Sequence, residues 1–182
     1  MACVEAALQA GDVAALLIGA EVGVAPGEGA KGLLAVAHVH DVALIVDQDY
    51  QLAKALGADG VQVGASVEDY TEARAALGDE MIVGIAKAPS RHIMMELAEA
   101  GASYVSFDDD ASDPDSLSAW WAEVMEVPCV THLAGHNDEV LSAVNAGIEF
   151  ISPDETMWQS PQHASETVRR LNDLIGKDSV AA

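Results

Sequence analysis

The strongest constraint on the fold is a short unit of sequence that combines a helix, a glycine and an apolar strand. Its clearest copy is DYQLAKALGADGVQVG at residues 49–64. Leu52, Ala53 and Leu56 recur at helical spacing and give the helix one apolar stripe. Gly57 stands where this helix should end, because glycine adopts the left-handed conformation without a Cβ clash. A short apolar strand follows at once, and this order is typical of a parallel α/β fold.

The same order returns at residues 99–107 and 145–152, so the unit repeats along the chain. Apolar strands recur roughly every twenty to twenty-five residues, as expected of successive βα units. A Gly/Pro-rich stretch at residues 21–29 is expected to be a loop, and Pro89 is expected in the first turn of a helix. The pattern predicts strands at residues 13–18, 42–46, 61–64, 81–86, 104–107, 129–133 and 150–151, with further helices at 1–10, 31–38, 67–77, 89–100, 116–125, 138–145 and 164–175.

Regular alternation of this kind predicts an α/β fold of the (β/α)8 TIM-barrel type, in preference to an open doubly wound sheet. The chain begins in a helical segment, so the predicted barrel lacks its first strand. A gap of that kind would expose strand edges, so either a partner such as a second copy of the chain in a homo-oligomer covers the gap, or the start of the chain has been cut or misassigned. We expect a single barrel domain over residues 1–176 and a polar C-terminal tail over residues 177–182.

The charge of the chain restricts its partners. Thirty Asp and Glu face eight Lys and Arg, which gives a formal net charge of −22. Such a chain repels nucleic acid and anionic membrane surfaces, and it disfavours highly phosphorylated ligands unless metal ions or helix N-termini offset the repulsion. The sequence has no apolar run of membrane-spanning length and no basic leader, and its two cysteines form no disulfide framework. A cytoplasmic protein is expected.

Residues 43–64, ALIVDQDYQLAKALGADGVQVG, resemble the thiamine-phosphate synthase family and its thiazole tautomerase relatives, which read "LIINDR…A…GADGVHLGQ.D" here. Residues 82–86 are similar to the family's "IIG.S", residues 101–106 to its "GADY", and residues 127–130 to the strand before its glycine pair. The resemblance implies a barrel transferase of thiamine biosynthesis. Such an enzyme couples thiazole phosphate with hydroxymethylpyrimidine pyrophosphate and uses magnesium.

Several functional residues that the resemblance implies are replaced in this chain. The family's metal-binding aspartate after its third strand falls on Gln48, and the Gln and Asp after its fourth strand fall on Ala65 and Val67. Its serine of strand five falls on Ala86, and its glycine pair on residues 133–134. Its phosphate-binding Thr and Lys fall in an acidic segment, and nothing basic stands where it has Arg and Lys on strand two. A pyrophosphate leaving group needs cations or N–H donors, so these losses oppose the family reaction.

The predicted carboxyl ends of the strands supply the candidate site, because barrel enzymes place their chemistry there. The candidates for ligand binding are Asp47, Gln48, Gln62, Lys87 and His132, with Asp108 and Asp109 as a candidate metal site and Glu155 or its neighbours at the last strand. These residue types permit acid–base or metal chemistry.

Each candidate also has a structural interpretation. Asp108 and Asp109 begin an acidic loop that binds a hard cation or is simply solvated, with Asp113 or Ser112 capping the next helix. His132 lies four residues from His136 but at a strand end, so helical zinc spacing does not apply. Lys87 is expected to stay charged and ion-paired. Structural roles are also predicted for residues outside the candidate site. His38 and His40 flank a helix-to-strand connection at the opposite end of the strands, and Trp120 and Trp121 are expected to pack in the core or an interface.

Two functions of different classes follow. The first is an enzyme of thiamine metabolism that uses an altered site around Asp47, Gln48, Gln62 and Lys87. The second is a non-catalytic relative that binds a small phosphorylated or heterocyclic ligand or a partner protein. Magnesium is implied only by the resemblance, and the missing metal and phosphate residues favour the second function.

Overall fold

The computed structural model describes residues 1–19, 28–87, 90–111, 113–133 and 136–178. The chain packs as two compact units. One, here the first-half unit, holds Ala14–Val105, and the other, the second-half unit, holds Met1–Val13 together with Ser106–Ala182.

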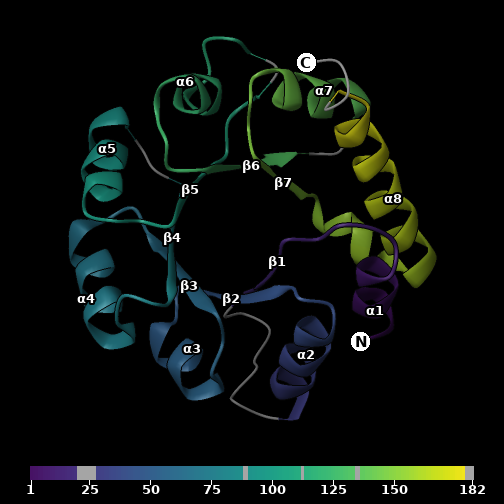
Figure 1. Cartoon of the computed structure of the whole chain (residues 1–182), viewed down its shortest axis with the longest axis horizontal. Helices are drawn as coiled ribbons and strands as arrows, with labels where there is room; N and C mark the ends of the chain where they lie inside the picture. The colour runs from purple at the N-terminus through teal and green to yellow at the C-terminus, as the bar shows by residue number, and fades with distance from the viewer. Residues whose placement is uncertain (20–27, 88–89, 112, 134–135, 179–182) are drawn as a thin grey trace. The chain divides into compact units, whose positions relative to one another are not determined.

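The first-half unit is a parallel sheet with helices on one face (Figure 1). Its strands pair in chain order, as the registers Leu16↔Leu44, Val46↔Val61 and Gly84↔Tyr104 show. Its elements are β1 (Ala15–Ile18), α2 (Glu28–Val39), β2 (Ala43–Asp47), α3 (Tyr50–Leu56), β3 (Gly60–Gly64), α4 (Val67–Leu77), β4 (Ile82–Ala86), α5 (Arg91–Glu99) and the start of β5 (Tyr104–Phe107). Parallel strands alternating with helices confirm the predicted α/β class.

The strand order decides between the two α/β architectures. Residues 27–32, GEGAKG, have the G-x-G-x-x-G spacing of a dinucleotide-binding turn. However, residues 28–32 lie in α2, and every strand of the first-half unit lies beside its neighbour in sequence. A doubly wound sheet reverses its strand order at the switch point where such a turn binds its ligand. Sequential order without reversal is that of a barrel-type sheet.

Local sequence signals place the helix ends of the first-half unit. The Asp49 side chain accepts the Leu52 N–H at 2.8 Å and caps α3. The predicted end of α3 at Gly57 is confirmed, since this glycine is left-handed with φ 71°. The Ser66 hydroxyl accepts the Asp69 N–H at 3.2 Å and caps α4, whose bounds match the prediction.

His38 has the structural role predicted for it. Its Nε2 lies 2.9 Å from Asp59 Oδ2, and the same oxygen accepts the Leu44 N–H at 2.7 Å. Asp59 thereby ties the end of α2 to the first residues of β2. This contact lies at the amino ends of the strands, where barrel proteins place stability rather than chemistry.

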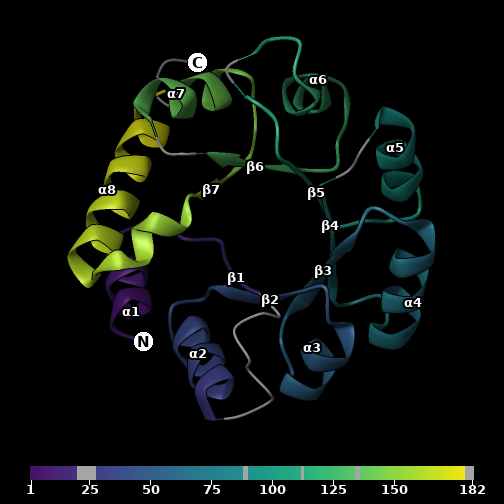
Figure 2. The ribbon, with the colours of Figure 1, turned by 180° about the vertical axis from the view of Figure 1, so that it is seen from behind.

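The second-half unit is built around a long C-terminal helix. Its elements are α1 (Ala2–Leu8), α6 (Leu117–Val124), β6 (Cys129–Leu133), α7 (Asn137–Asn145), β7 (Phe150–Pro153), the 3-10 helix η2 (Glu155–Gln159) and α8 (Pro161–Asp178). Helix α1 lies against α8 in both views (Figures 1 and 2). Ala7, Met157, Ala164 and Val168 form the core between them.

Polar contacts fix the chain between α1 and α8. Asn172 Oδ1 accepts the Asp12 N–H at 2.6 Å, and Asn172 Nδ2 donates to the Asp12 carbonyl at 3.1 Å. A Cβ on the neighbouring Gly11 would lie 2.8 Å from Asn172 Oδ1, so this close approach requires glycine.

The predicted packing role of the tryptophan pair is confirmed for Trp121. This side chain is fully buried, and its Nε1–H donates to the Val127 carbonyl at 2.7 Å. Its ring centroid lies 6.1 Å from Phe107 and 6.3 Å from Trp120, within the range of favourable aromatic pairs.

Several predicted boundaries differ from the structure. Helix α2 begins at Glu28, so the predicted loop was wrong at residues 28–29, and the rest of it lies largely outside the described residues. Helix α5 begins at Arg91 behind a Ser90 cap, and Pro89 lies outside the described residues. The 3-10 helix η2 was missed, and α8 begins earlier than predicted and includes the first two residues of the predicted tail. Within the described residues, no helix has the length and apolarity to cross a membrane.

The two cysteines should differ sharply in reactivity, because Cys129 is buried and Cys3 is half-buried. Burial, followed by the charge of Glu149, raises the pKa of the Cys129 thiol to about 12. The thiolate is the reactive form, so Cys129 should stay inert in the native protein at pH 8. A disulfide reagent is therefore expected to modify Cys3 quickly and Cys129 only at the rate of unfolding. The Cys3→Ser variant should contain no thiol that reacts quickly with the reagent. Rapid modification of one thiol per molecule in that variant would contradict this assignment.

Candidate functional site

Four residues form one row across β2, β3, β4 and β5 of the first-half unit. The registers place Asp47 opposite Gln62, Gln62 opposite Gly84, and Gly84 opposite Tyr104. Alternate strand residues such as Val46, Val61 and Val83 are fully buried, so the row occupies the opposite face of the sheet from these core valines. Asp47 is the last residue of β2, at the carboxyl end where barrel enzymes place their chemistry, whereas Gln62 and Gly84 lie in the middle of β3 and β4 and Tyr104 begins β5. We call these four residues the Asp47 row.

Gly84 allows the row to be connected. A Cβ on this residue would overlap the Tyr104 ring, so the ring occupies the space above β4 that a side chain would fill. The Tyr104 hydroxyl therefore reaches past β4 and donates to Gln62 Oε1 on β3 at 3.1 Å. Glycine inside a strand often marks such a close approach.

The hydrogen bonds of the row have a fixed direction. Gln62 Nε2 donates to Asp47 Oδ1 at 3.1 Å, and Gln48 Nε2 donates to the same oxygen at 3.3 Å. A carboxylate only accepts, so the Gln62 amide must turn its NH2 to Asp47 and its oxygen to Tyr104. The result is an oriented chain from the tyrosine hydroxyl to the carboxylate.

Burial keeps the Tyr104 hydroxyl of this hydrogen-bonded row protonated. Gln62 is 6% exposed, and burial followed by the charge of Asp47 raises the pKa of the Tyr104 hydroxyl. Tyr104 is therefore a neutral donor throughout the physiological range. Asp47 Oδ1 takes both amide bonds, whereas Asp47 Oδ2 makes no hydrogen bond to another described residue. That second oxygen is the acceptor that a bound ligand would meet.

Backbone strain marks the strand ends next to the row. Gln48 follows β2 with φ 62°, and Lys87 follows β4 with φ 48°, both in the left-handed region. Such residues cost of order 1–3 kcal/mol each and concentrate at functional sites. The Gln48 N–H donates to the Gln62 carbonyl at 2.7 Å, which holds the strained turn beside the row.

The structure brings together three of the predicted site residues, namely Asp47, Gln48 and Gln62. Lys87 lies at the end of β4 as expected and has an interaction of its own. His132 lies on β6 of the second-half unit, and its role stays a prediction. Tyr104, which donates to Gln62 in the row, was not among the predicted site residues. The signal that could have found it is a strand glycine placed next to an aromatic residue on the following strand.

The acidic segment after β5 has a structural role at one position. Asp109 Oδ2 accepts the Ser118 N–H at 2.9 Å at the start of α6. The cap of α6 is Ser116, which accepts the Ala119 N–H, so the predicted cap at Asp113 was wrong and Ser112 lies outside the described residues. Metal binding by Asp108 and Asp109 stays a prediction.

The described residues do not fit the magnesium site that the resemblance implies. None of them form a group of three or more His, Cys, Asp and Glu side chains that could hold a metal ion. Gln48, a neutral amide, stands where the family's metal-binding aspartate is expected. Asp47 is the single carboxylate of the row, and Asp49 is engaged as the α3 cap.

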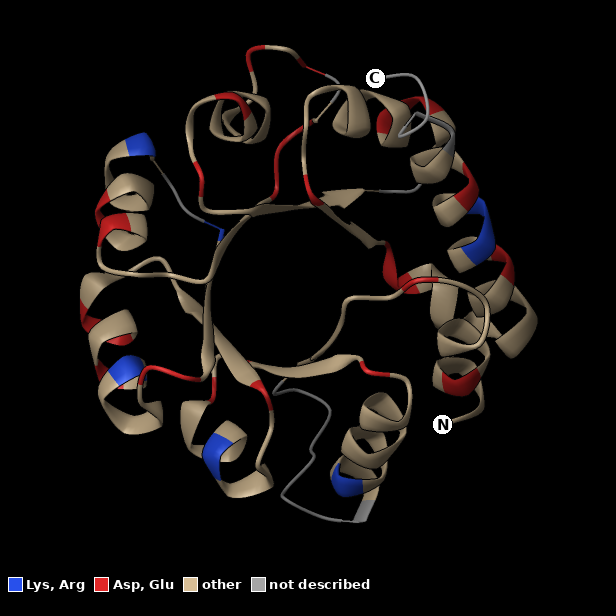
Figure 3. Ribbon diagram, in the orientation of Figure 1, with Lys and Arg blue, Asp and Glu red and all other residues tan. Residues whose placement is uncertain are grey.

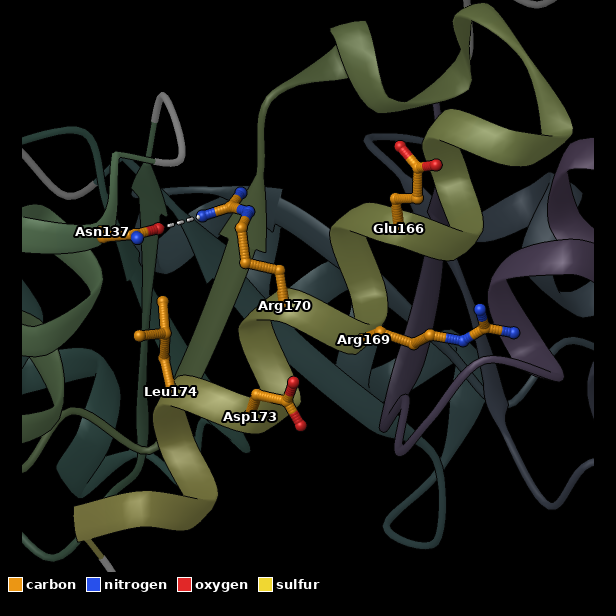
Figure 4. A pocket seen from close by; sticks show the side chains of 6 residues that line it. All are labelled: Asn137, Glu166, Arg169, Arg170, Asp173 and Leu174. Carbon is orange, nitrogen blue, oxygen red and sulfur yellow. Dashed lines mark hydrogen bonds between the residues drawn. The ribbon is translucent and has the colours of Figure 1, made fainter.

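A second, larger cleft lies on the second-half unit. Its volume is about 380 Å³ and its walls come from α8 and the first residue of α7 (Figure 4). Arg170 donates to Asn137 Oδ1 at 2.8 Å within it. Two acidic and two basic side chains of α8 line it, so their formal charges balance; the lining is Asn137, Glu166, Arg169, Arg170, Asp173 and Leu174. Elsewhere in the described chain, acidic residues far outnumber basic ones (Figure 3).

The raised pKa of Tyr104 predicts a loss of stability at alkaline pH. In the unfolded chain this hydroxyl ionises near pH 10, whereas in the folded chain it keeps its proton to higher pH. The folded state then binds more protons, so the free energy of unfolding should fall as pH rises above about 10. Tyr104→Phe should flatten this dependence, which urea unfolding at several pH values measures. An equally steep dependence in the variant would contradict the assignment.

Comparison with known proteins identifies the family. Residues 1–153 match the family model described as thiamine monophosphate synthase. The chain is 36% identical over 147 residues to the thiamine-phosphate synthase of Erythrobacter litoralis, covering 75% of this chain and 69% of the relative. It is 35% identical over 185 residues to the thiamine-phosphate synthase of Rhodospirillum centenum, and the match covers 93% of this chain and 87% of that relative.

Solved structures agree at the level of fold. The thiamine phosphate pyrophosphorylase from Pyrococcus furiosus matches with a TM-score of 0.79 at 20% identity, over 96% of this chain and 88% of that one. An orotidine 5'-phosphate decarboxylase from Pyrococcus horikoshii matches with a TM-score of 0.69 at 14% identity, over 95% and 91%. These matches and the sequential strand order confirm the predicted TIM-barrel type of fold. The chain belongs to the thiamine monophosphate synthase family.

Proposed function

We propose that this chain acts in thiamine metabolism by binding a nitrogen heterocycle at the Asp47 row, without carrying out the coupling reaction of its family. One observation supports this most strongly. The Asp47 carboxylate is held by Gln62 and Gln48 through one oxygen, and the other oxygen has no hydrogen-bond partner among the described residues. A site of this kind selects a ligand that brings N–H donors or a protonated ring nitrogen.

Charge argues against a phosphorylated group at the same place. A phosphate near Asp47 would meet a carboxylate in a chain of net charge −22. Anion sites in proteins use cations, helix N-termini or clustered backbone N–H groups. The row instead offers to a ligand a carboxylate oxygen, while the Tyr104 hydroxyl and one N–H of the Gln62 amide already donate within the row. The four residues of the row include no cation to stabilise the pyrophosphate leaving group of the coupling reaction.

The experiment is a calorimetric titration with hydroxymethylpyrimidine and hydroxyethylthiazole, each with and without its phosphate groups. Hydroxymethylpyrimidine, whose ring carries an amino group, is expected to bind and its pyrophosphate to bind more weakly. A hydrogen bond to a charged group contributes about 1.5–3 kcal/mol, so Asp47→Asn should weaken binding by about 10- to 100-fold.

Asp79→Asn is the matched control, because it removes the same charge from an exposed position of the same unit. It should bind like the parent chain. Circular dichroism of both variants verifies that each is folded. No heat from any of the heterocycles, or equal losses in the two variants, would refute the proposal.

The second candidate is the family reaction itself, and the similarity to curated relatives favours it. The Rhodospirillum centenum relative is a thiamine-phosphate synthase and matches 93% of this chain at 35% identity. Formation of thiamine phosphate from the two family substrates would establish this candidate. A cytoplasmic location and pairing with a second copy of the chain remain predictions under either function.

A further inference from the structure

A small cleft adjoins the Asp47 row at the carboxyl ends of β2 and β3. Its lining is Gln48, Tyr50, Val63, Gly64 and Asp69, and its volume is about 110 Å³. Pockets that enclose a whole small molecule usually measure 300 Å³ or more. One water takes up about 30 Å³ in the liquid, so this cleft has room for one compact functional group.

Two acceptor oxygens converge over Gly64 in the cleft. A Cβ on that glycine would lie 3.3 Å from Asp69 Oδ2 and 3.8 Å from Gln48 Oε1. The Gln48 Nε2 atom donates to Asp47 Oδ1 at 3.3 Å. Because the amide nitrogen is held in this way, the Gln48 Oε1 atom is the end of the amide that faces the cleft. Gln48 thus connects the cleft to the Asp47 row.

The carboxylate of Asp69, in the first turn of α4, makes no capping hydrogen bond to its own helix. The Asp69 N–H donates to Ser66 Oγ, but the return bond of a capping box is absent, because the Ser66 N–H goes to the Gly64 carbonyl at 2.8 Å. Asp69 is exposed, and neither of its carboxylate oxygens makes a hydrogen bond to another described residue, so both are open to solvent or to a ligand. The cleft therefore presents a negative charge and an amide oxygen, with no positively charged residue in its lining.

We propose that this cleft is a subsite for a compact cationic group with at least two N–H donors, such as an amidinium or a protonated amino group on a ring. Asp69 would accept one N–H and Gln48 Oε1 another, while Val63 supplies an apolar wall. The same charge excludes a phosphate group. The proposal rests on the proposed function in one respect, since the group is taken to belong to the heterocycle held at the Asp47 row.

The test uses acetamidinium chloride as the probe, at constant ionic strength, with tetramethylammonium chloride as a cation that has no N–H. Saturation-transfer NMR or a titration of amide resonances measures binding to the full chain. Acetamidinium should bind and tetramethylammonium should not. Asp69→Asn should weaken acetamidinium binding about 10-fold or more. Gly64→Ala should block it by filling the cleft.

Two matched variants keep the test specific. Glu68→Gln removes the same charge from the neighbouring residue of the same helical turn, which does not line the cleft. Gly176→Ala adds a methyl group where a Cβ meets nothing within 4 Å. Both should bind acetamidinium like the parent. Equal weakening in Glu68→Gln and Asp69→Asn would overturn the proposal, because it would show a general surface-charge effect.

Inorganic pyrophosphate with magnesium is the opposing probe. If the parent chain binds pyrophosphate with magnesium and Asp69→Asn abolishes that binding, the proposal is overturned, since the cleft would then be a site for an anion and its metal ion. The test separates this inference from the proposed function. Acetamidinium binding without heterocycle binding would support the subsite and refute the proposed function. Heterocycle binding without acetamidinium binding would support the proposed function and refute the subsite.

Discussion

Gly84→Ala is expected to destabilise the protein by about 1–3 kcal/mol or more, as is usual when a group is forced into filled space. The added Cβ would overlap the Tyr104 ring, which cannot move without losing its bond to Gln62 Oε1. Gly84 has no left-handed φ, so the backbone accepts alanine and the effect comes from the side chain. Urea unfolding of the parent and the variant measures the difference in free energy.

A double-mutant cycle isolates the cause. In a Tyr104→Ala background the obstacle is gone, so adding Gly84→Ala should cost less than about 0.5 kcal/mol. Gly176→Ala is the control for exchanging a glycine, and it should be neutral or slightly stabilising because that position is helical and open. The same cost of Gly84→Ala in both backgrounds would contradict the packing described for the Asp47 row.

Trp121→Ala is expected to cost about 3–5 kcal/mol, the usual range for removing a large buried aromatic side chain. Trp121 is fully buried against Phe107, and its indole N–H is the donor to the Val127 carbonyl. The total stability of a domain is only about 5–15 kcal/mol, so the transition midpoint in urea should fall markedly.

Two other variants separate the contributions at this site. Trp121→Phe keeps an aromatic ring but leaves the Val127 carbonyl without its donor, which should cost about 1–3 kcal/mol. Trp158→Ala is the control, because that side chain is 39% exposed and should contribute much less. A cost below about 1.5 kcal/mol for Trp121→Ala would contradict its place in the core.

The sequence predicted the fold well where local chemistry and periodicity agree. The α4 helix had matching bounds because Ser66 and Gly78 mark its two ends. The errors lie where such signals compete. Residues 28–29 follow a Gly/Pro-rich stretch but join α2, and η2 is a single short turn that leaves no helical stripe in the sequence.

The site was predicted in part for a similar reason. Asp47 and Gln48 could be found because they stand at the carboxyl end of β2, and Gln62, in the middle of β3, lies beside Asp47 in the register of the two strands. Tyr104 could not be found from its own strand, since its role depends on the absence of a side chain at Gly84, a residue twenty positions away. Asp69 was missed because an acidic residue in the first turn of a helix is ordinarily explained by the helix dipole.

The most direct test of the proposed function is a coupling assay with the protein in excess over both family substrates. Thiazole phosphate and hydroxymethylpyrimidine pyrophosphate are mixed with magnesium and the parent chain, and thiamine phosphate is quantified over time. Our account predicts no product above the uncatalysed background, while hydroxymethylpyrimidine binds to the same preparation and Asp47→Asn weakens that binding. Product that forms in proportion to the protein added would contradict the account and establish the chain as a synthase.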